Sequence, residues 1–204
     1  MYERIVPRMG AACGAVFVVL LFGLSSSGID SRIVLVGELI GLLLFIPFLG
    51  YLCSVLREAE GLGGWLAATA FGAGLVNIAI KLGSIAPGNA ADRFADGTAT
   101  HQALDVMNST AFIATMLPLS VLTAAAAVVI VRTRVLPRWL GWLAAVTAPL
   151  LLVNGMFLDA EFGPAFLLFL LWVLLTSVIL TVRPGHVRSG SEPVQPLPTA
   201  SSPA

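Results

Sequence analysis

Residues 33–56 read IVLVGELIGLLLFIPFLGYLCSVL, and Glu38 is the one charged side chain in this run. A helix needs about 20 mainly apolar residues to cross the hydrocarbon core of a bilayer, which is roughly 30 Å thick. The run is long enough to do so, and it is too long for a buried strand. We therefore predict that this segment crosses a membrane as a helix.

The rest of the chain has the same character. Of its 204 residues, 58% are hydrophobic and 11% are charged, whereas about 25% of a soluble domain is charged. The apolar runs lack the alternating pattern of membrane barrel strands, so only helices can satisfy the backbone in lipid. We predict an all-α, polytopic membrane bundle over residues 1–182. Its six transmembrane helices are expected at residues 10–24, 33–56, 62–85, 104–131, 139–158 and 164–182.

The arginines predict the orientation of the bundle, because basic residues accumulate in cytoplasmic loops. One side would carry Arg4, Arg8, Arg57, Arg132, Arg134, Arg138, Arg183 and Arg188. The other side would carry Arg32 and Arg93. Both termini are therefore predicted to be cytoplasmic. Residues 183–204, rich in Pro, Ser and Gly, are predicted to form a disordered cytoplasmic tail.

The first run has a second interpretation. Arg4 and Arg8 precede it and small residues follow it at 25–28, as in a secretory signal peptide. Cleavage would leave five spans. We favour an uncleaved helix, because further spans follow directly and because Gly10 and Gly14 suit close helix packing.

Two charged residues within the spans are predicted to pair. The second and third runs form an antiparallel hairpin that turns near residue 59, so facing residues have numbers that sum to about 118. Glu38 and Lys81 meet this condition and should lie at one depth. Ionisable groups inside a membrane are costly unless they are paired, so we predict a salt bridge between these two side chains.

Further polar residues are predicted to gather in the outer half of the bundle. With the pair, the candidate binding cluster comprises Glu38, Asn77, Lys81, Asp105, Asn108 and Asn154. Structural roles are the alternative: the lysine would extend to the surface, Asp105 suits a helix N-terminus, and interhelical Asn contacts contribute roughly 0.6 kcal/mol each. The segment at 87–100, the longest loop, would cover this cluster.

Weaker patterns concern packing. The sequence GWLAA occurs at 64–68 and at 141–145, and Asn77 and Asn154 follow the two copies at the same distance. This indicates either a duplicated helix pair or chance in an apolar composition. Kinks are expected at Pro47, Pro118 and Pro149. Two sets of small residues are expected to pack inside the bundle: the pair Gly37 and Gly41, and the triplet Gly64, Ala68 and Gly72. Homodimerisation through these residues is the second interpretation.

Several functions are disfavoured. Eleven basic residues balance eleven acidic ones, which leaves no surplus to attract nucleic acid. Cys13, Cys53, His101 and His186 lie far apart and form no metal-binding motif, and haem would need facing histidine pairs. We therefore expect no cofactor. An enzyme would need a nucleophile with a base or a metal, and the nearest candidate is a pairing of His101 with Asp105.

The segments at 37–41 (GELIG), 56–61 (LREAEG) and 136–143 (LPRWLGWL) are similar to those of small bacterial integral membrane proteins classed as a domain of unknown function. The resemblance covers about residues 5–182 and implies a six-helix protein of the bacterial plasma membrane. It supplies no activity, substrate or catalytic residue.

The leading hypothesis is a non-enzymatic protein of the lipid bilayer that binds or moves a small solute, ion or lipid through the outward-facing cluster. The alternative is an accessory or regulatory membrane subunit without its own ligand. The inner half of the bundle, which holds no charged residue, favours this alternative because it offers no continuous polar path.

Overall fold

The computed structural model describes residues 2–25, 31–91, 93–158 and 163–182, and within these ranges all secondary structure is helical. The all-α prediction is therefore confirmed, while the predicted tail at 183–204 lies outside the described residues. The elements are α1 (Tyr2–Ser25), α2 (Ser31–Glu60), α3 (Trp65–Ala91), α4 (Ala99–Ala114), α5 (Met116–Thr133), α6 (Arg138–Val153), a π-helix (Asn154–Leu158) and α7 (Pro164–Val182).

Five helical segments are long and apolar enough to cross a membrane: Ile33–Glu60, Trp65–Ala91, Ala99–Thr133, Arg138–Phe157 and Pro164–Val182. The first predicted span corresponds to a shorter apolar stretch of α1, Met9–Phe22. Large apolar side chains such as Val19, Leu43 and Val76 are exposed on the outside of the bundle, as expected for helices surrounded by lipid. These are the features of a multi-pass membrane protein, and the orientation of the termini stays a prediction.

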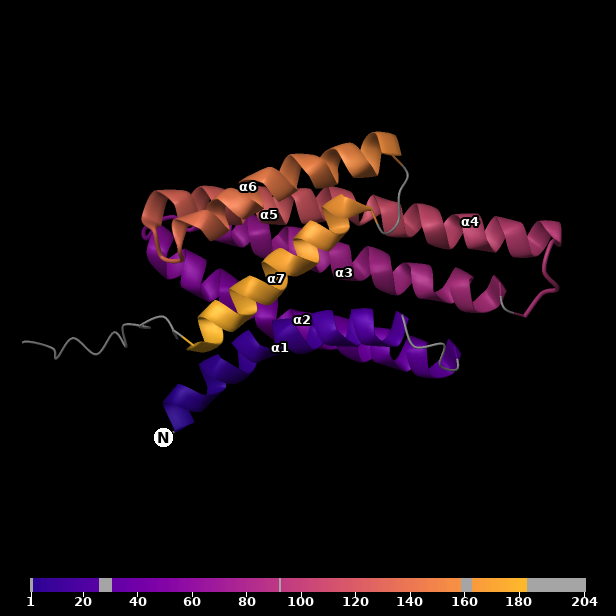
Figure 1. The fold of residues 1–204 in the computed structure, drawn as a ribbon, viewed down its shortest axis with the longest axis horizontal. Helices are drawn as coiled ribbons and strands as arrows, with labels where there is room; N and C mark the ends of the chain where they lie inside the picture. Colours follow the sequence, from indigo (N-terminus) through magenta and orange to yellow (C-terminus); the bar gives the residue numbers. More distant parts are fainter. Residues whose placement is uncertain (1, 26–30, 92, 159–162, 183–204) are drawn as a thin grey trace, which may run out of the picture.

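Figure 1 shows the helices running along the bundle with α7 crossing it obliquely, and the contacts between the helices close them into a ring. Each packs against the next: α1 on α2, α2 on α3, α3 on α5, α5 on α6, α6 on α7, and α7 back on α1. Helix α4 leads into α5 and packs along α3, so α4 and α5 together make one long span. Short connections place α2 beside α3 and α5 beside α6, whereas the contact of α7 with α1 joins segments far apart in the sequence.

Glycines allow the helices to approach closely, as predicted. A Cβ added at Gly14 in α1 would come within 2.5 Å of Phe48 in α2. One added at Gly74 in α3 would overlap Leu49 of α2 and come within 3.1 Å of Leu122 of α5. The prediction was wrong for Ala68 and Gly72, which are exposed, with no atom within 4 Å of a Cβ at Gly72. These two residues lie on the side of α3 that faces away from α2 and α5.

Ser177 of α7 joins α1 and α7. Its hydroxyl donates to the Ala11 carbonyl at 2.5 Å and accepts from the Ala15 amide at 2.8 Å. Residues four apart in a helix normally bond to each other through these two backbone groups. The serine therefore inserts into the backbone ladder of α1, where a hydroxyl is a recognised cause of helix bending.

The third span begins later than predicted. Leu62 lies in a turn, fully exposed, and α3 begins at Trp65. Gly61, Gly63 and Gly64 have φ values of 78°, 122° and 47°, a left-handed region that side chains disfavour and that interrupts the helix. The Glu60 carboxylate accepts hydrogen bonds from the first amides of α3, at 3.2 Å and 3.1 Å, and so caps the helix.

The prediction of a long loop at 87–100 was also wrong. Helix α3 continues through Pro87 to Ala91, and α4 starts at Ala99. Thr98 caps α4, because its side chain accepts from the His101 amide at 3.2 Å. The connection is therefore too short to act as a cover, and the ends of the two helices form the walls of the site instead.

Of the three predicted kinks, the one at Pro118 coincides with a break. The long span is interrupted at Thr115, between α4 and α5. Proline has no amide to bond the carbonyl four residues earlier, and its ring crowds that carbonyl. Pro149 lies in α6 just before the π-helix, whereas Pro47 lies within the continuous helix α2.

Candidate functional site

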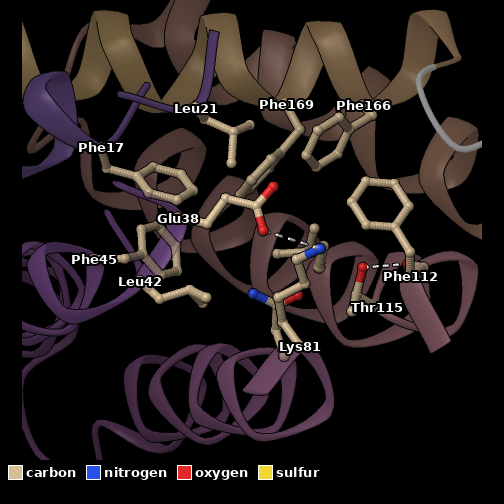
Figure 2. A pocket seen from close by; sticks show the side chains of 12 residues that line it. Phe17, Leu21, Glu38, Leu42, Phe45, Lys81, Phe112, Thr115, Phe166 and Phe169 are labelled. Carbon is tan, nitrogen blue, oxygen red and sulfur yellow. Dashed lines mark hydrogen bonds and ion pairs between the residues drawn. The ribbon is translucent and has the colours of Figure 1, made fainter. Parts of the chain in front are cut away.

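The predicted pairing of Glu38 and Lys81 is confirmed. Glu38 projects from α2 and Lys81 from α3, and the Lys81 Nζ lies 3.9 Å from the Glu38 Oε2 (Figure 2). The Lys81 and Glu38 side chains are 17% and 28% exposed. The distance allows electrostatic attraction but is too long for a hydrogen bond, so each group keeps hydrogen-bonding capacity.

An aromatic ring completes the surroundings of the lysine. The Lys81 Nζ lies 4.9 Å from the centroid of the Phe112 ring of α4, within the range of a cation–π contact. The ammonium is therefore held between a carboxylate and an aromatic face, and it does not simply extend to the surface. Three helices that follow one another in the chain, α2, α3 and α4, each contribute one group to this arrangement.

A small cavity lies on one side of the ion pair. Its volume is about 40 Å³, enough for roughly one to three waters. Five phenylalanines dominate its lining (Figure 2): Phe17, Phe45, Phe112, Phe166 and Phe169. They come from α1, α2, α4 and α7 and contact one another, with ring centroids 4.9 Å apart for Phe17 and Phe45 and 5.3 Å apart for Phe112 and Phe166. Asn77 and Thr115 are its polar lining residues besides the ion pair. We call this space the aromatic cavity.

A larger cavity lies on the other side of the ion pair. Its volume is about 180 Å³, and it is lined by Val34, Leu35, Glu38, Lys81, Ile85, Gly88, Asn89 and Asn108. Gly88 and Asn89 lie about two turns beyond Lys81, near the end of α3. This polar cavity is therefore nearer to the turn between α3 and α4, and the aromatic cavity is deeper in the bundle. Glu38 and Lys81 line both cavities and separate them.

The six residues of the predicted cluster do not converge on one point. Besides the pair, Asn77 lines the aromatic cavity and Asn108 lines the polar cavity. Asp105 is exposed on α4 and lines neither of these two cavities. Asn154, 1% exposed at the start of the π-helix, also lines neither. The two asparagines that follow the repeated GWLAA segments thus have different surroundings.

Other lining residues were not predicted. Asn89 was assigned to a loop, although it lies in α3 and faces the polar cavity. Phe112 follows Asn108 by four residues, a spacing that places both on one helix face. Phe17, Phe45 and the pair Phe166 and Phe169 are separated by long stretches of sequence and carried no signal of their own.

The predicted pair of His101 and Asp105 does not form. The His101 Nε2 lies 3.5 Å from the Asp96 Oδ1 instead. The reason is that α4 starts at Ala99, which brings the first turn of the helix close to the preceding segment. In the described part of the chain, no three His, Cys, Asp or Glu residues are grouped so that they could hold a metal ion.

No family model, curated protein or solved structure matches the chain. The resemblance to small bacterial membrane proteins therefore rests on the quoted segments alone and assigns no family.

Proposed function

We propose that this protein is a six-span protein of the bacterial plasma membrane, with both termini in the cytoplasm, that binds a small solute or lipid headgroup in the polar cavity. The observation that carries the proposal is the position of the ion pair between a polar and an aromatic cavity. Charged residues within a membrane are rare and commonly mark ligand and ion pathways.

The direction of access follows from the predicted orientation. With the basic loops in the cytoplasm, the turn between α3 and α4 lies on the outer side, and the polar cavity opens towards it. The ion pair would then form the floor of this cavity and the entrance to the aromatic cavity. Movement of a ligand across the bundle would require this pair to separate.

Binding without catalysis fits the lining best. The described residues that line the two cavities supply amides, one hydroxyl, one ion pair and apolar groups, with no histidine or cysteine among them. The hydroxyl belongs to Thr115 and donates to the Phe112 carbonyl of its own helix. A nucleophile activated by a neighbouring base is therefore missing from the lining.

The accessory-subunit alternative draws on one observation. Ala68 and Gly72 form an exposed surface of small residues on α3 with open space beside it, and such surfaces allow another transmembrane helix to approach. In this alternative the ion pair only holds α2 and α3 together, and the polar cavity needs no access to water.

Cysteine accessibility distinguishes the two. In a parent with Cys13 and Cys53 replaced by alanine, Asn108→Cys places a thiol in the polar cavity. In sealed vesicles of known orientation, we expect a membrane-impermeant cationic methanethiosulfonate to modify it from the outer side. The rate should approach that of Asp96→Cys, which is exposed near the same end of the bundle.

Two further variants serve as controls. Ala126→Cys, completely buried in α5, should not react, and Asn77→Cys, beyond the ion pair, should react slowly until Lys81→Met is added. If Asn108→Cys is as inert as Ala126→Cys, or reacts only from the opposite side, the proposed function is wrong and the accessory alternative is favoured.

A further inference from the structure

The charges that line the two cavities restrict the ligand. Among the residues that the structure describes, the lining contains one carboxylate, Glu38, one ammonium, Lys81, and no other charged group. A ligand with a single charge would pair with one of them and leave the other uncompensated in a partly buried site, which is unfavourable. An uncharged ligand would gain little from either group. A ligand with one positive and one negative group leaves every charge paired.

The geometry of the pair leaves both groups available. Charge-assisted hydrogen bonds are about 2.7–2.9 Å long, and the 3.9 Å between Nζ and Oε2 is clearly longer. The three N–H groups of the lysine and the oxygens of the carboxylate therefore keep capacity to bind a third group. Both residues line the polar cavity, so such a group can reach them from the same side.

The volumes set the size of the ligand. The polar cavity, about 180 Å³, is many times larger than the roughly 10–15 Å³ that a cavity needs to hold one water. This is room for a small zwitterion. The aromatic cavity, about 40 Å³, admits at most a short apolar substituent. The amide side chains of Asn89 and Asn108 add neutral hydrogen-bonding groups at the wall of the polar cavity.

From these observations we infer that the polar cavity binds a small zwitterion whose anionic group contacts Lys81 and whose cationic group contacts Glu38. This inference rests on the proposed function and specifies the ligand of the same site. A free zwitterion and the headgroup of a zwitterionic phospholipid share the required chemistry, and the test separates these two sources.

The test uses three matched probes: glycine, acetate and methylammonium, where glycine combines the charged groups of the other two. The full-length protein is placed in nanodiscs of anionic phosphatidylglycerol. Two readouts are measured for each probe: the labelling rate of Asn108→Cys, and the melting temperature of the protein without substitutions. We expect glycine to slow the labelling about tenfold at a concentration roughly ten times its Kd, and to raise the melting temperature. Acetate and methylammonium, alone or together, should have neither effect, and Lys81→Met should abolish the effect of glycine.

The lipid source has its own arm. If phosphatidylethanolamine in the nanodisc reproduces the protection and glycine does not, the zwitterion is a lipid headgroup and the inference stands. The inference is overturned if acetate or methylammonium protects as well as glycine. It is also overturned if the thiol is readily labelled and neither glycine nor the zwitterionic lipid protects it. In both cases the proposal of an accessible cavity still holds. If the thiol is never labelled, the proposed function fails as well.

Discussion

Replacing Gly74 with valine should destabilise the protein by about 3 kcal/mol, the upper end of the usual cost of overpacking a core. A Cβ at this position would overlap the Cδ2 of Leu49 and lie 2.8 Å from its Cδ1 and 3.1 Å from the Cδ1 of Leu122. Both leucines are fully buried, so neither side chain has free space into which it can move. Helix α3 would have to move away from α2 and α5, and the hairpin that carries the ion pair would separate.

Gly72→Val is the matched control for this substitution. It introduces the same side chain on the same helix, but nothing lies within 4 Å of its Cβ, so the expected change is within about 0.5 kcal/mol. Unfolding of both variants in mixed detergent micelles, followed by circular dichroism, measures the difference. Equal stability of the two variants would show that α3 does not pack against α2 and α5 in this way.

The second large effect concerns the ion pair. Glu38→Gln and Lys81→Met should each reduce the free energy of unfolding by about 2 kcal/mol, less than the 3–5 kcal/mol typical of a fully buried pair, because both side chains keep some contact with solvent. Each single change leaves the other charge without its partner. The double variant removes both charges, so its loss should also be about 2 kcal/mol, far less than the two single losses together.

The same unfolding assay measures this cycle. Glu58→Gln provides the control, because Glu58 lies in the same helix, has the same charge and is exposed, so its removal should cost less than about 0.5 kcal/mol. Losses that simply add in the double variant would mean that the two charges do not interact, and the description of the pair as one unit would have to be abandoned.

The spans and the ion pair were predictable because each depends on position along the chain. The thickness of a bilayer sets the length of an apolar run, and the last predicted span, residues 164–182, coincides with α7. An antiparallel hairpin fixes which residues lie at one depth, and this was sufficient to pair Glu38 with Lys81. Neither argument requires knowledge of the other helices.

The rest of the site depends on rotation about the helix axes and on the order of the helices. Asp105 and Asn154 were predicted to join the cluster on the basis of depth, but one is exposed and the other is buried away from both cavities. The aromatic cavity requires that α7 closes the ring against α1, which brings Phe166 and Phe169 close to Phe17. No local pattern in the sequence encodes that closure.

The starts and ends of the helices were the other source of error. Three glycines delay the start of α3 to Trp65, and α3 extends to Ala91, well into the predicted outer loop, while α4 starts just before the end of that loop. Pro87 lies within α3, where hydropathy and proline together suggested a break. As a result, Gly88 and Asn89 changed from predicted loop residues to walls of the polar cavity.

The central claim is that Glu38 and Lys81 form the water-accessible floor of a cavity open to the outer side, and chemical modification of Lys81 tests it most directly. Lys81 is the one lysine in the sequence, so its acetylation by a membrane-impermeant N-hydroxysulfosuccinimide ester can be followed by peptide mass spectrometry without engineering the site. Asp96→Lys supplies an exposed reference lysine near the same end of the bundle.

In sealed vesicles, we expect Lys81 to be acetylated when the reagent is outside, more slowly than the lysine of Asp96→Lys, and faster in Glu38→Gln because the ammonium then loses its partner. The contradicting result would be a Lys81 that stays unmodified from the outer side in both the parent and Glu38→Gln. This result counts only if the lysine of Asp96→Lys reacts fully under the same conditions.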